Sequence, residues 1–192
     1  MTKEQFWNKF LSLFEEGSES LSVAQDNWNN KKKFTKLFVN DYIRKIINEN
    51  NSQTTQREYF RIDITSYKNR KEEAKKIAKE LNLDNCGIKQ YLWELEVALE
   101  HENNSSEWID EVIKLSFINC PLRVVIGYTD LEKRDNCLKL AAALLKERIG
   151  NNTPKGQSFI VILGKSGIKG SQVNKSTYKA YEYKNAEFKE MK

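Results

Sequence analysis

Two short apolar segments separated by a helical pattern constrain the fold of this chain more than any other feature. Residues 121–128 (PLRVVIGY) and 158–164 (SFIVILG) are apolar on both sides, which is typical of strands covered on both faces. Between them, Thr129 and Glu132 have the spacing of a capping box, which predicts a long helix that ends near Gly150. Strands that alternate with helices in this way predict an α/β fold, with a mixed central β-sheet flanked by helices.

The first half of the chain combines helical and alternating patterns. Apolar residues at helical spacing predict helices over residues 6–14, 34–47 and 69–82. The inner side of the third helix holds Ala74, Ile77, Ala78 and Leu81. Residues 57–67 (REYFRIDITSY) alternate instead, which predicts one strand with Asp63 on its polar face. The apolar face of that strand holds Phe60, Ile62 and Ile64.

Composition excludes several classes of protein. The longest apolar stretches are about five residues, whereas a membrane helix needs about 20. The start of the sequence lacks the charged-then-apolar pattern of a cleavable leader. Cys86, Cys120 and Cys137 lie far apart, which fits a reducing compartment. We therefore expect a soluble, cytoplasmic protein without a membrane partner.

The positive charge of the chain is concentrated near its end. The formal net charge is +5, and residues 151–192 hold 8 basic and 3 acidic side chains. Basic and aromatic residues interleave there, which favours contacts with the phosphates and bases of a nucleic acid. The residues in question are Lys175, Tyr178, Lys179, Tyr181 and Lys184. Solvated lysines on an exposed, tyrosine-rich edge strand are the alternative interpretation.

The strongest candidate for chemistry lies in residues 91–103 (YLWELEVALEHEN). The alternation predicts a strand with an apolar and an acidic face. The apolar face holds Trp93, Leu95, Val97 and Leu99, and the other face holds Glu94, Glu96, Ala98, Glu100 and Glu102. Carboxylates this close repel each other, so they need water, basic partners or a cation. A wet, solvated face is one interpretation, and a metal site is the other.

A metal site would use the end of this strand. Glu100 and Glu102 are two residues apart, so their side chains point the same way and suit a hard cation such as Mg²⁺. Asp63 would complete an oxygen-rich site if its strand pairs with this one.

The order of these elements resembles the PD-(D/E)XK nuclease superfamily, which has the restriction-endonuclease-like fold. In that family an Asp precedes a strand that ends in Glu-x-Lys, and a helix and a buried strand follow. The resemblance covers roughly residues 35–165. Asp63 matches the Asp of the motif, Glu100 its Glu, and Glu102 the position usually held by Lys.

The sequence departs from the family pattern at the third position. It reads Glu-His-Glu, without a preceding Pro-Asp pair; some restriction-type enzymes carry Glu-x-Glu, and others move the lysine to the following helix. Lys114 is then the candidate, with Glu111 one turn earlier. An ordinary surface i,i+3 pair of Glu111 and Lys114 is the alternative interpretation. A rival register puts the motif at Glu94 and Glu96.

The resemblance implies a Mg²⁺- or Mn²⁺-dependent nuclease that hydrolyses DNA phosphodiester bonds, in restriction, repair or defence. Asp63, Glu100 and the backbone carbonyl of His101 would hold the metal ion. Glu102 or Lys114 would orient or deprotonate the attacking water. The expected partner is nucleic acid, DNA rather than RNA, and the protein is expected to act as a homodimer if it cuts both strands.

We expect a single domain over residues 1–192. It would comprise N-terminal helices (1–50), a nuclease-like core (51–165) and a basic C-terminal segment (166–192). The alternative function is that of a catalytically inactive protein of the same fold, which binds nucleic acid or a protein partner as a subunit. A purely structural assembly protein is a third class, and it would predict an exposed apolar patch.

Overall fold

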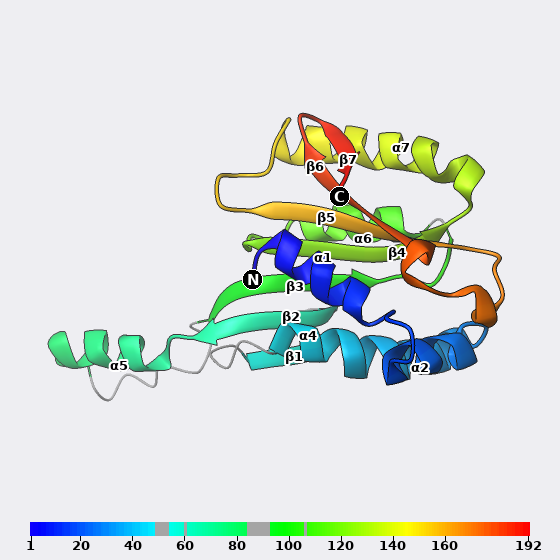
Figure 1. Ribbon diagram of the computed structural model, residues 1–192. Helices are drawn as coiled ribbons and strands as arrows, with labels where there is room; N and C mark the ends of the chain where they lie inside the picture. Colours follow the sequence, from blue (N-terminus) through cyan, green and yellow to red (C-terminus); the bar gives the residue numbers. More distant parts are fainter. Residues whose placement is uncertain (49–53, 60, 84–92, 106) are drawn as a thin grey trace.

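A central sheet covered by helices on both faces organises the molecule (Figure 1). The computed structural model describes residues 1–48, 54–59, 61–83, 93–105 and 107–192. In this part of the chain, a seven-stranded sheet has the order β1-β2-β3-β4-β5-β6-β7. The strands are β1 (Thr54–Tyr59), β2 (Ile62–Asn69), β3 (Trp93–His101), β4 (Leu122–Thr129), β5 (Ser158–Lys165), β6 (Tyr178–Lys184) and β7 (Glu187–Glu190).

The sheet is mixed, as the sequence predicts. Strands β3, β4 and β5 are parallel to one another, and every other neighbouring pair is antiparallel. The two continuously apolar segments form β4 and β5, in which nearly every residue is buried. The prediction of an α/β fold with a mixed sheet is confirmed.

The helices form two layers. The N-terminal layer contains α1 (Lys3–Ser12), α2 (Glu19–Asn27), α3 (Lys31–Phe34), a π-helical segment η1 (Thr35–Ile43) and α4 (Arg44–Asn48). The opposite layer contains α6 (Trp108–Ser116) and α7 (Leu131–Ile149). The remaining helices are α5 (Lys71–Glu80) and two short 3-10 turns, Gly170–Gln172 and Lys175–Thr177. No helix in the described ranges is both long and apolar enough to cross a membrane.

Each layer encloses its own apolar core. On the N-terminal side, aromatic residues such as Phe10 and Phe38 pack against one face of the sheet. On the other side, Trp108 of α6 and Leu145 of α7 pack against Val125 and its neighbours. Consecutive residues of β3 and β4 therefore enter opposite cores, because side chains alternate along a strand.

The predicted strand over residues 57–67 is wrong, because the chain reverses within it. Tyr59 of β1 pairs with Ile62 of β2 in a tight hairpin. Arg61 adopts a left-handed backbone conformation with φ 63°, which turns the chain without a glycine. Phe60 lies outside the described residues. Ile64 enters the core on the N-terminal side, whereas Ile62 enters the opposite one.

Helix α5 differs from the sequence expectation on its inner side. Ala74 and Ala78 are buried, but Ile77 and Leu81 are exposed. The helix extends away from the helical layers (Figure 1), so its large apolar side chains do not enter either of the two cores that the described residues form.

Helix α7 begins one residue later than the sequence suggests. Asp130 is its N-cap, and Thr129 is the last residue of β4, so the predicted capping box with Glu132 is wrong. Gly150 is the C-cap with φ 78°, as predicted.

Candidate active site at the end of strand β3

A bulge divides the acidic residues of β3 into two groups. Ser66 pairs with Val97, but the next residue, Tyr67, pairs with Leu95. Glu96 is therefore an extra residue in β3, and the alternation of side chains reverses there. Val97 enters the core on the N-terminal side, whereas Leu95 packs against the opposite core. The prediction that all the glutamates share one face is wrong for this reason.

The first group, Glu94 and Glu96, lies near the start of β3. Two basic side chains at or just after the end of β2, Lys68 and Arg70, pair with these carboxylates. Glu94 lies 3.4 Å from Arg70, and Glu96 lies 3.0 Å from Lys68. Lys68 and Arg70 are about half exposed, so these are surface ion pairs of small energetic value. The rival register of the motif would use these two paired residues, at the opposite end of β2 from Asp63.

The second group brings Asp63 and Glu100 together. The pairing of Ile64 with Leu99 places Asp63 opposite Glu100, on the same face of the sheet. Asp63 Oδ2 accepts a hydrogen bond of 2.8 Å from the backbone N–H of His101. Glu100 is 2% exposed, which is rare for a carboxyl group.

Lys114 of α6 reaches the same point. Its Nζ lies 2.7 Å from Glu100 Oε1 and 2.5 Å from Glu111 Oε2. It also donates a hydrogen bond of 3.1 Å to the carbonyl of Arg61 in the β1–β2 turn. Lys114 and Glu111 are thus more than an i,i+3 surface pair, because the ammonium also contacts a buried carboxyl group on β3.

A glycine allows α6 to come this close to the sheet. A Cβ atom at Gly127 of β4 would lie 2.5 Å from the Cβ of Trp108, the first residue of α6. Trp108 is fully buried, so the helix is seated directly on the strand. This contact sets the position from which Glu111 and Lys114 extend toward β3.

The electrostatics of this charged cluster (Asp63, Glu100, Glu111 and Lys114) are unusual. Burial raises the pKa of Glu100 to about 8, and the charges of Asp63 and Glu111 add to the rise, while the hydrogen bond from Lys114 opposes it. Burial lowers the pKa of Lys114, but its hydrogen bonds and charge interactions with Glu100 and Glu111 outweigh burial and raise it overall. A buried carboxyl group with a perturbed pKa and a specific charged partner is typical of functional sites.

His101 and Glu102 lie apart from the cluster. The imidazole of His101 is buried on the opposite face of β3, where its Nε2 lies 3.0 Å from the hydroxyl of Tyr128. Only its backbone is therefore on the side of Asp63. The carboxylate of Glu102 accepts a hydrogen bond of 2.7 Å from the backbone N–H of Asn104, in the turn after β3. The structure brings Asp63, Glu100 and Lys114 together and leaves Glu102 in that turn.

The donor set of the cluster fits a hard cation with two protein ligands. Among the residues that the structure describes, no three His, Cys, Asp or Glu side chains are placed to hold a metal ion. Mg²⁺ usually needs only one or two carboxylates, since water and substrate phosphate complete its coordination. Asp63 and Glu100, whose negative charges repel each other, supply such a pair.

The tyrosines of the C-terminal segment do not lie on the predicted nucleic-acid surface, whereas Lys175, Lys179 and Lys184 are exposed. Strand β6 lies between β5 and β7, so Tyr178 and Tyr181 are buried in the two cores. Lys179 Nζ donates hydrogen bonds of 2.8 Å and 3.1 Å to the two carboxylate oxygens of Glu190. The alternative of an exposed edge strand is also wrong, because β7 covers that edge.

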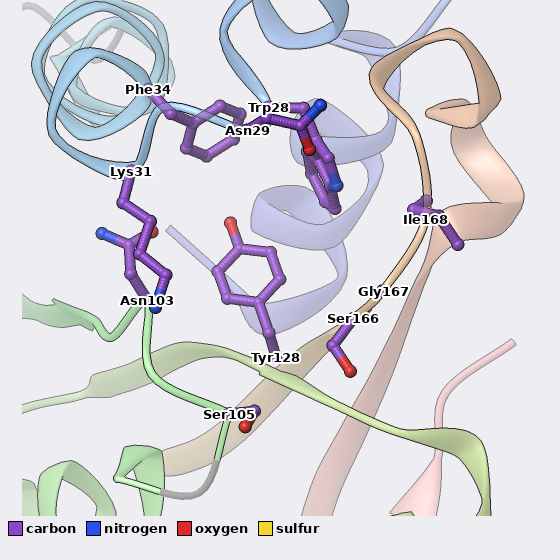
Figure 2. Close-up of a pocket in the computed structure, with 10 residues that line it drawn as sticks. All are labelled: Trp28, Asn29, Lys31, Phe34, Asn103, Ser105, Tyr128, Ser166, Gly167 and Ile168. Atoms are coloured by element: carbon purple, nitrogen blue, oxygen red, sulfur yellow. The ribbon is translucent and has the colours of Figure 1, made fainter.

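The structure also contains a pocket that sequence reasoning missed. Its volume is about 340 Å³, and it lies on the N-terminal side of the sheet (Figure 2). It is lined by Trp28, Asn29, Lys31, Phe34, Asn103, Ser105, Tyr128, Ser166, Gly167 and Ile168. One sequence signal was available: residues 28–33 (WNNKKK) place a tryptophan directly before amide and basic side chains.

Comparison of the chain with protein-family models, with curated proteins and with solved structures finds no match. The chemistry of both sites therefore has to be inferred from their own geometry.

Proposed function

We propose that this chain is a Mg²⁺- or Mn²⁺-dependent nuclease that hydrolyses DNA phosphodiester bonds on a restriction-endonuclease-like fold. The observation that carries the proposal is the convergence of Asp63, Glu100 and Lys114 at the end of β3. The element order supports it, because an antiparallel β1–β2–β3 unit is followed by α6 and a parallel β4. This order agrees with the resemblance to the PD-(D/E)XK superfamily.

Each residue of the charged cluster has a role in the proposed mechanism. Asp63 and Glu100 would hold the metal ion, with the backbone carbonyl of His101 as a further ligand. When bound, the ion would supply Lewis acidity and lower the pKa of a water molecule. The backbone N–H of His101 orients Asp63 at 2.8 Å. Lys114 would orient the attacking water and stabilise negative charge on the phosphate, while Glu111 holds its ammonium group at 2.5 Å.

Two features support a nucleic acid as the substrate class within this proposal, and the family resemblance implies DNA. The net positive charge of +5 favours a polyanionic partner. The charged cluster combines three carboxyl groups with one ammonium; two of the carboxyl groups, those of Asp63 and Glu100, suit a divalent cation, and the ammonium of Lys114 suits a phosphodiester. Enzymes that cut both strands often use two such sites, so the proposal includes a homodimer. The wide spacing of the three cysteines favours a reducing, cytoplasmic compartment.

The test is the cleavage of supercoiled plasmid and of single-stranded DNA in Mg²⁺ and in Mn²⁺. We expect cleavage by the wild type, none after addition of EDTA, and none by Glu100→Ala. Glu96→Ala is the matched control, since it removes a carboxylate of the same strand that is paired with Lys68. Loss of cleavage in Glu96→Ala alone would favour the rival register. No cleavage by the wild type and no Mn²⁺ binding by calorimetry would favour the inactive binding subunit instead.

A further inference from the structure

The pocket in Figure 2 lies where the parallel strands end. Strands β3, β4 and β5 finish at His101, Thr129 and Lys165. The segments that leave β3 and β5 contribute Asn103 and Ser166 to the pocket. In α/β folds, ligands bind outside the carboxyl ends of parallel strands. The volume of about 340 Å³ lies within the range of small-molecule sites.

Three aromatic rings form one part of the wall (Figure 2). The ring centroid of Trp28 lies 5.5 Å from those of Phe34 and Tyr128, at interplanar angles of 86° and 80°. Phe34 and Tyr128 are buried, whereas Trp28 is partly exposed. Perpendicular rings hold one another in place by edge-to-face contacts, and Trp28 is the partly exposed ring of the three against which a planar ligand can stack.

The Tyr128 ring of the aromatic wall is held by two side chains that do not line the pocket. The hydroxyl of Tyr128 lies 3.0 Å from Nε2 of the buried His101 and 3.5 Å from the hydroxyl of Tyr178. Because these partners come from two other strands, the Tyr128 ring is held independently of any ligand. The pocket is therefore largely formed in advance, which lowers the entropic cost of binding.

The opposite part of the wall is polar and basic. Lys31 donates a hydrogen bond of 2.8 Å to Asn104 Oδ1, which places its ammonium beside the turn after β3. Lys32 and Lys33 follow it and are exposed. The amide of Asn103 donates to Thr35 Oγ1 at 2.7 Å, and the hydroxyl of Ser166 donates to Asp130. A ligand here would meet rings on one side, and amide groups and cations on the other.

We propose that this pocket binds a nucleotide, with its base against Trp28 and Tyr128 and its phosphate beside Lys31. A planar heteroaromatic ring that carries an anionic group matches both parts of the wall. The nucleotide is either free or one unit of a single strand, whose flanking phosphates would then lie near Lys32 and Lys33. The proposal does not depend on the nuclease activity proposed above.

The experiment is calorimetric titration of the full chain with AMP, TMP and ribose 5-phosphate in EDTA. We expect AMP and TMP to bind, and ribose 5-phosphate to bind at least about tenfold more weakly because it lacks the stacking base. Trp28→Ala should weaken AMP binding by about tenfold or more. Lys31→Ala should weaken it by roughly threefold. Lys139→Ala, an exposed lysine on α7, should leave the affinity unchanged.

A second variant separates loss of binding from loss of folding. Ser105 is exposed and lines the pocket, so Ser105→Trp should block the pocket and leave the circular dichroism spectrum unchanged. Anisotropy of a fluorescein-labelled oligo-dT in EDTA distinguishes the two sources of the nucleotide. Binding of the oligomer alone, lost in Trp28→Ala and Ser105→Trp, would assign the pocket to a strand. Binding of AMP with the same losses would assign it to a free nucleotide.

The proposal is overturned if neither mononucleotides nor the oligomer bind, or if binding is the same in Trp28→Ala and Ser105→Trp as in the wild type. Because EDTA removes divalent cations, these results are independent of DNA cleavage. DNA cleavage without nucleotide binding would contradict the pocket proposal alone. Nucleotide binding without DNA cleavage would contradict the nuclease proposal alone.

Discussion

Glu100 and His101 are neighbours in β3, yet their side chains enter two different environments. Glu100 faces α6, where Lys114 lies 2.7 Å away and the charge of Asp63 acts on it. His101 faces the N-terminal helices, where its ring contacts Tyr128 and Phe34. Both are almost fully buried. Burial raises the pKa of the first to about 8 and lowers that of the second to about 3.

The difference shows how one strand end presents two different chemical environments. In both residues burial disfavours the charged form. On the α6 face, however, other charged groups surround Glu100, which suits a cation and a phosphate. On the opposite face His101 stays neutral and fixes an aromatic wall, which suits a planar ring. If the charged cluster cuts DNA and the pocket binds one unit of the same strand, that strand crosses the end of β3 with a phosphate on one side and a base on the other.

The largest effect is expected from Asp63→Asn. This variant removes one of the two carboxylates that would hold the metal ion, so DNA cleavage should fall by about 100- to 1000-fold. Glu94→Gln is the matched control, because its carboxylate pairs with Arg70 near the start of β3. Initial rates of plasmid nicking in Mg²⁺ measure both. Equal rates for Asp63→Asn and the wild type would place the chemistry elsewhere.

Two glycines test the two faces separately. In Gly127→Ala the new Cβ would meet Trp108 at 2.5 Å, and in Gly164→Ala it would meet the Tyr128 ring at 2.7 Å. Each should lower the free energy of unfolding by about 1–3 kcal/mol, because overpacking forces neighbours to shift. Urea denaturation measures the loss.

The glycine variants should also differ in function. Gly127→Ala displaces α6 and so should reduce DNA cleavage, whereas Gly164→Ala displaces Tyr128 and so should reduce nucleotide binding. The reverse pattern would contradict the assignment of the two activities to the two faces.

A smaller effect is expected from Lys114→Met. The variant leaves Glu100 beside Asp63 without its ammonium partner, and the free energy of unfolding near pH 8.5 should fall by about 1 kcal/mol. The loss is modest because Lys114 is about one-third exposed and because Glu100 can take up a proton. In Lys75→Met, which breaks a fully exposed pair on α5, no loss should be measurable by urea denaturation. If Lys75→Met lowered the free energy of unfolding as much as Lys114→Met does, burial of the charged cluster would not explain the effect of Lys114→Met.

His101 gives a pH-dependent effect. Burial lowers its pKa from 6.5 to about 3, so below pH 6.5 the unfolded chain binds a proton that the folded chain does not. The contribution of His101 to stability should therefore fall as the pH drops from 6.5 toward 5, by at most about 1.4 kcal/mol per pH unit, whereas Glu100, whose pKa is raised, contributes in the opposite direction over the same range. The chain has one histidine, so its ring resonances can be followed directly by NMR. They should not titrate between pH 5 and 8, and a midpoint near 6.5 would contradict the buried, neutral ring.

Sequence patterns predicted the elements that carry their own local signal. Strands β4 and β5 and helix α7 followed from apolar runs and from Gly150, because the signal lies within each segment. Local patterns failed where the chain departs from regular alternation. The turn at Arg61 uses a left-handed residue other than glycine, and the bulge at Glu96 adds a residue that simple alternation does not reveal.

The charged cluster was partly predictable and the pocket was not. Asp63 and Glu100 were identified from the polar faces of their strands and Lys114 through a family resemblance, but the juxtaposition of Asp63 and Glu100 depends on the pairing of Ile64 with Leu99, which no local pattern encodes. The pocket combines side chains from four separate segments of the chain. Tyr178 and Tyr181 are buried because β6 lies between β5 and β7 with a core on each face. The local sequence does not reveal these neighbours.

The most direct test of the central claim is Mn²⁺ binding without any nucleic acid, followed by electron paramagnetic resonance. The charged cluster predicts that the wild type and Glu96→Gln bind Mn²⁺ with the same affinity, and that Glu100→Gln loses this binding. Equal binding by all three proteins, or no binding by the wild type, would contradict a metal site formed by Asp63 and Glu100 at the end of β3.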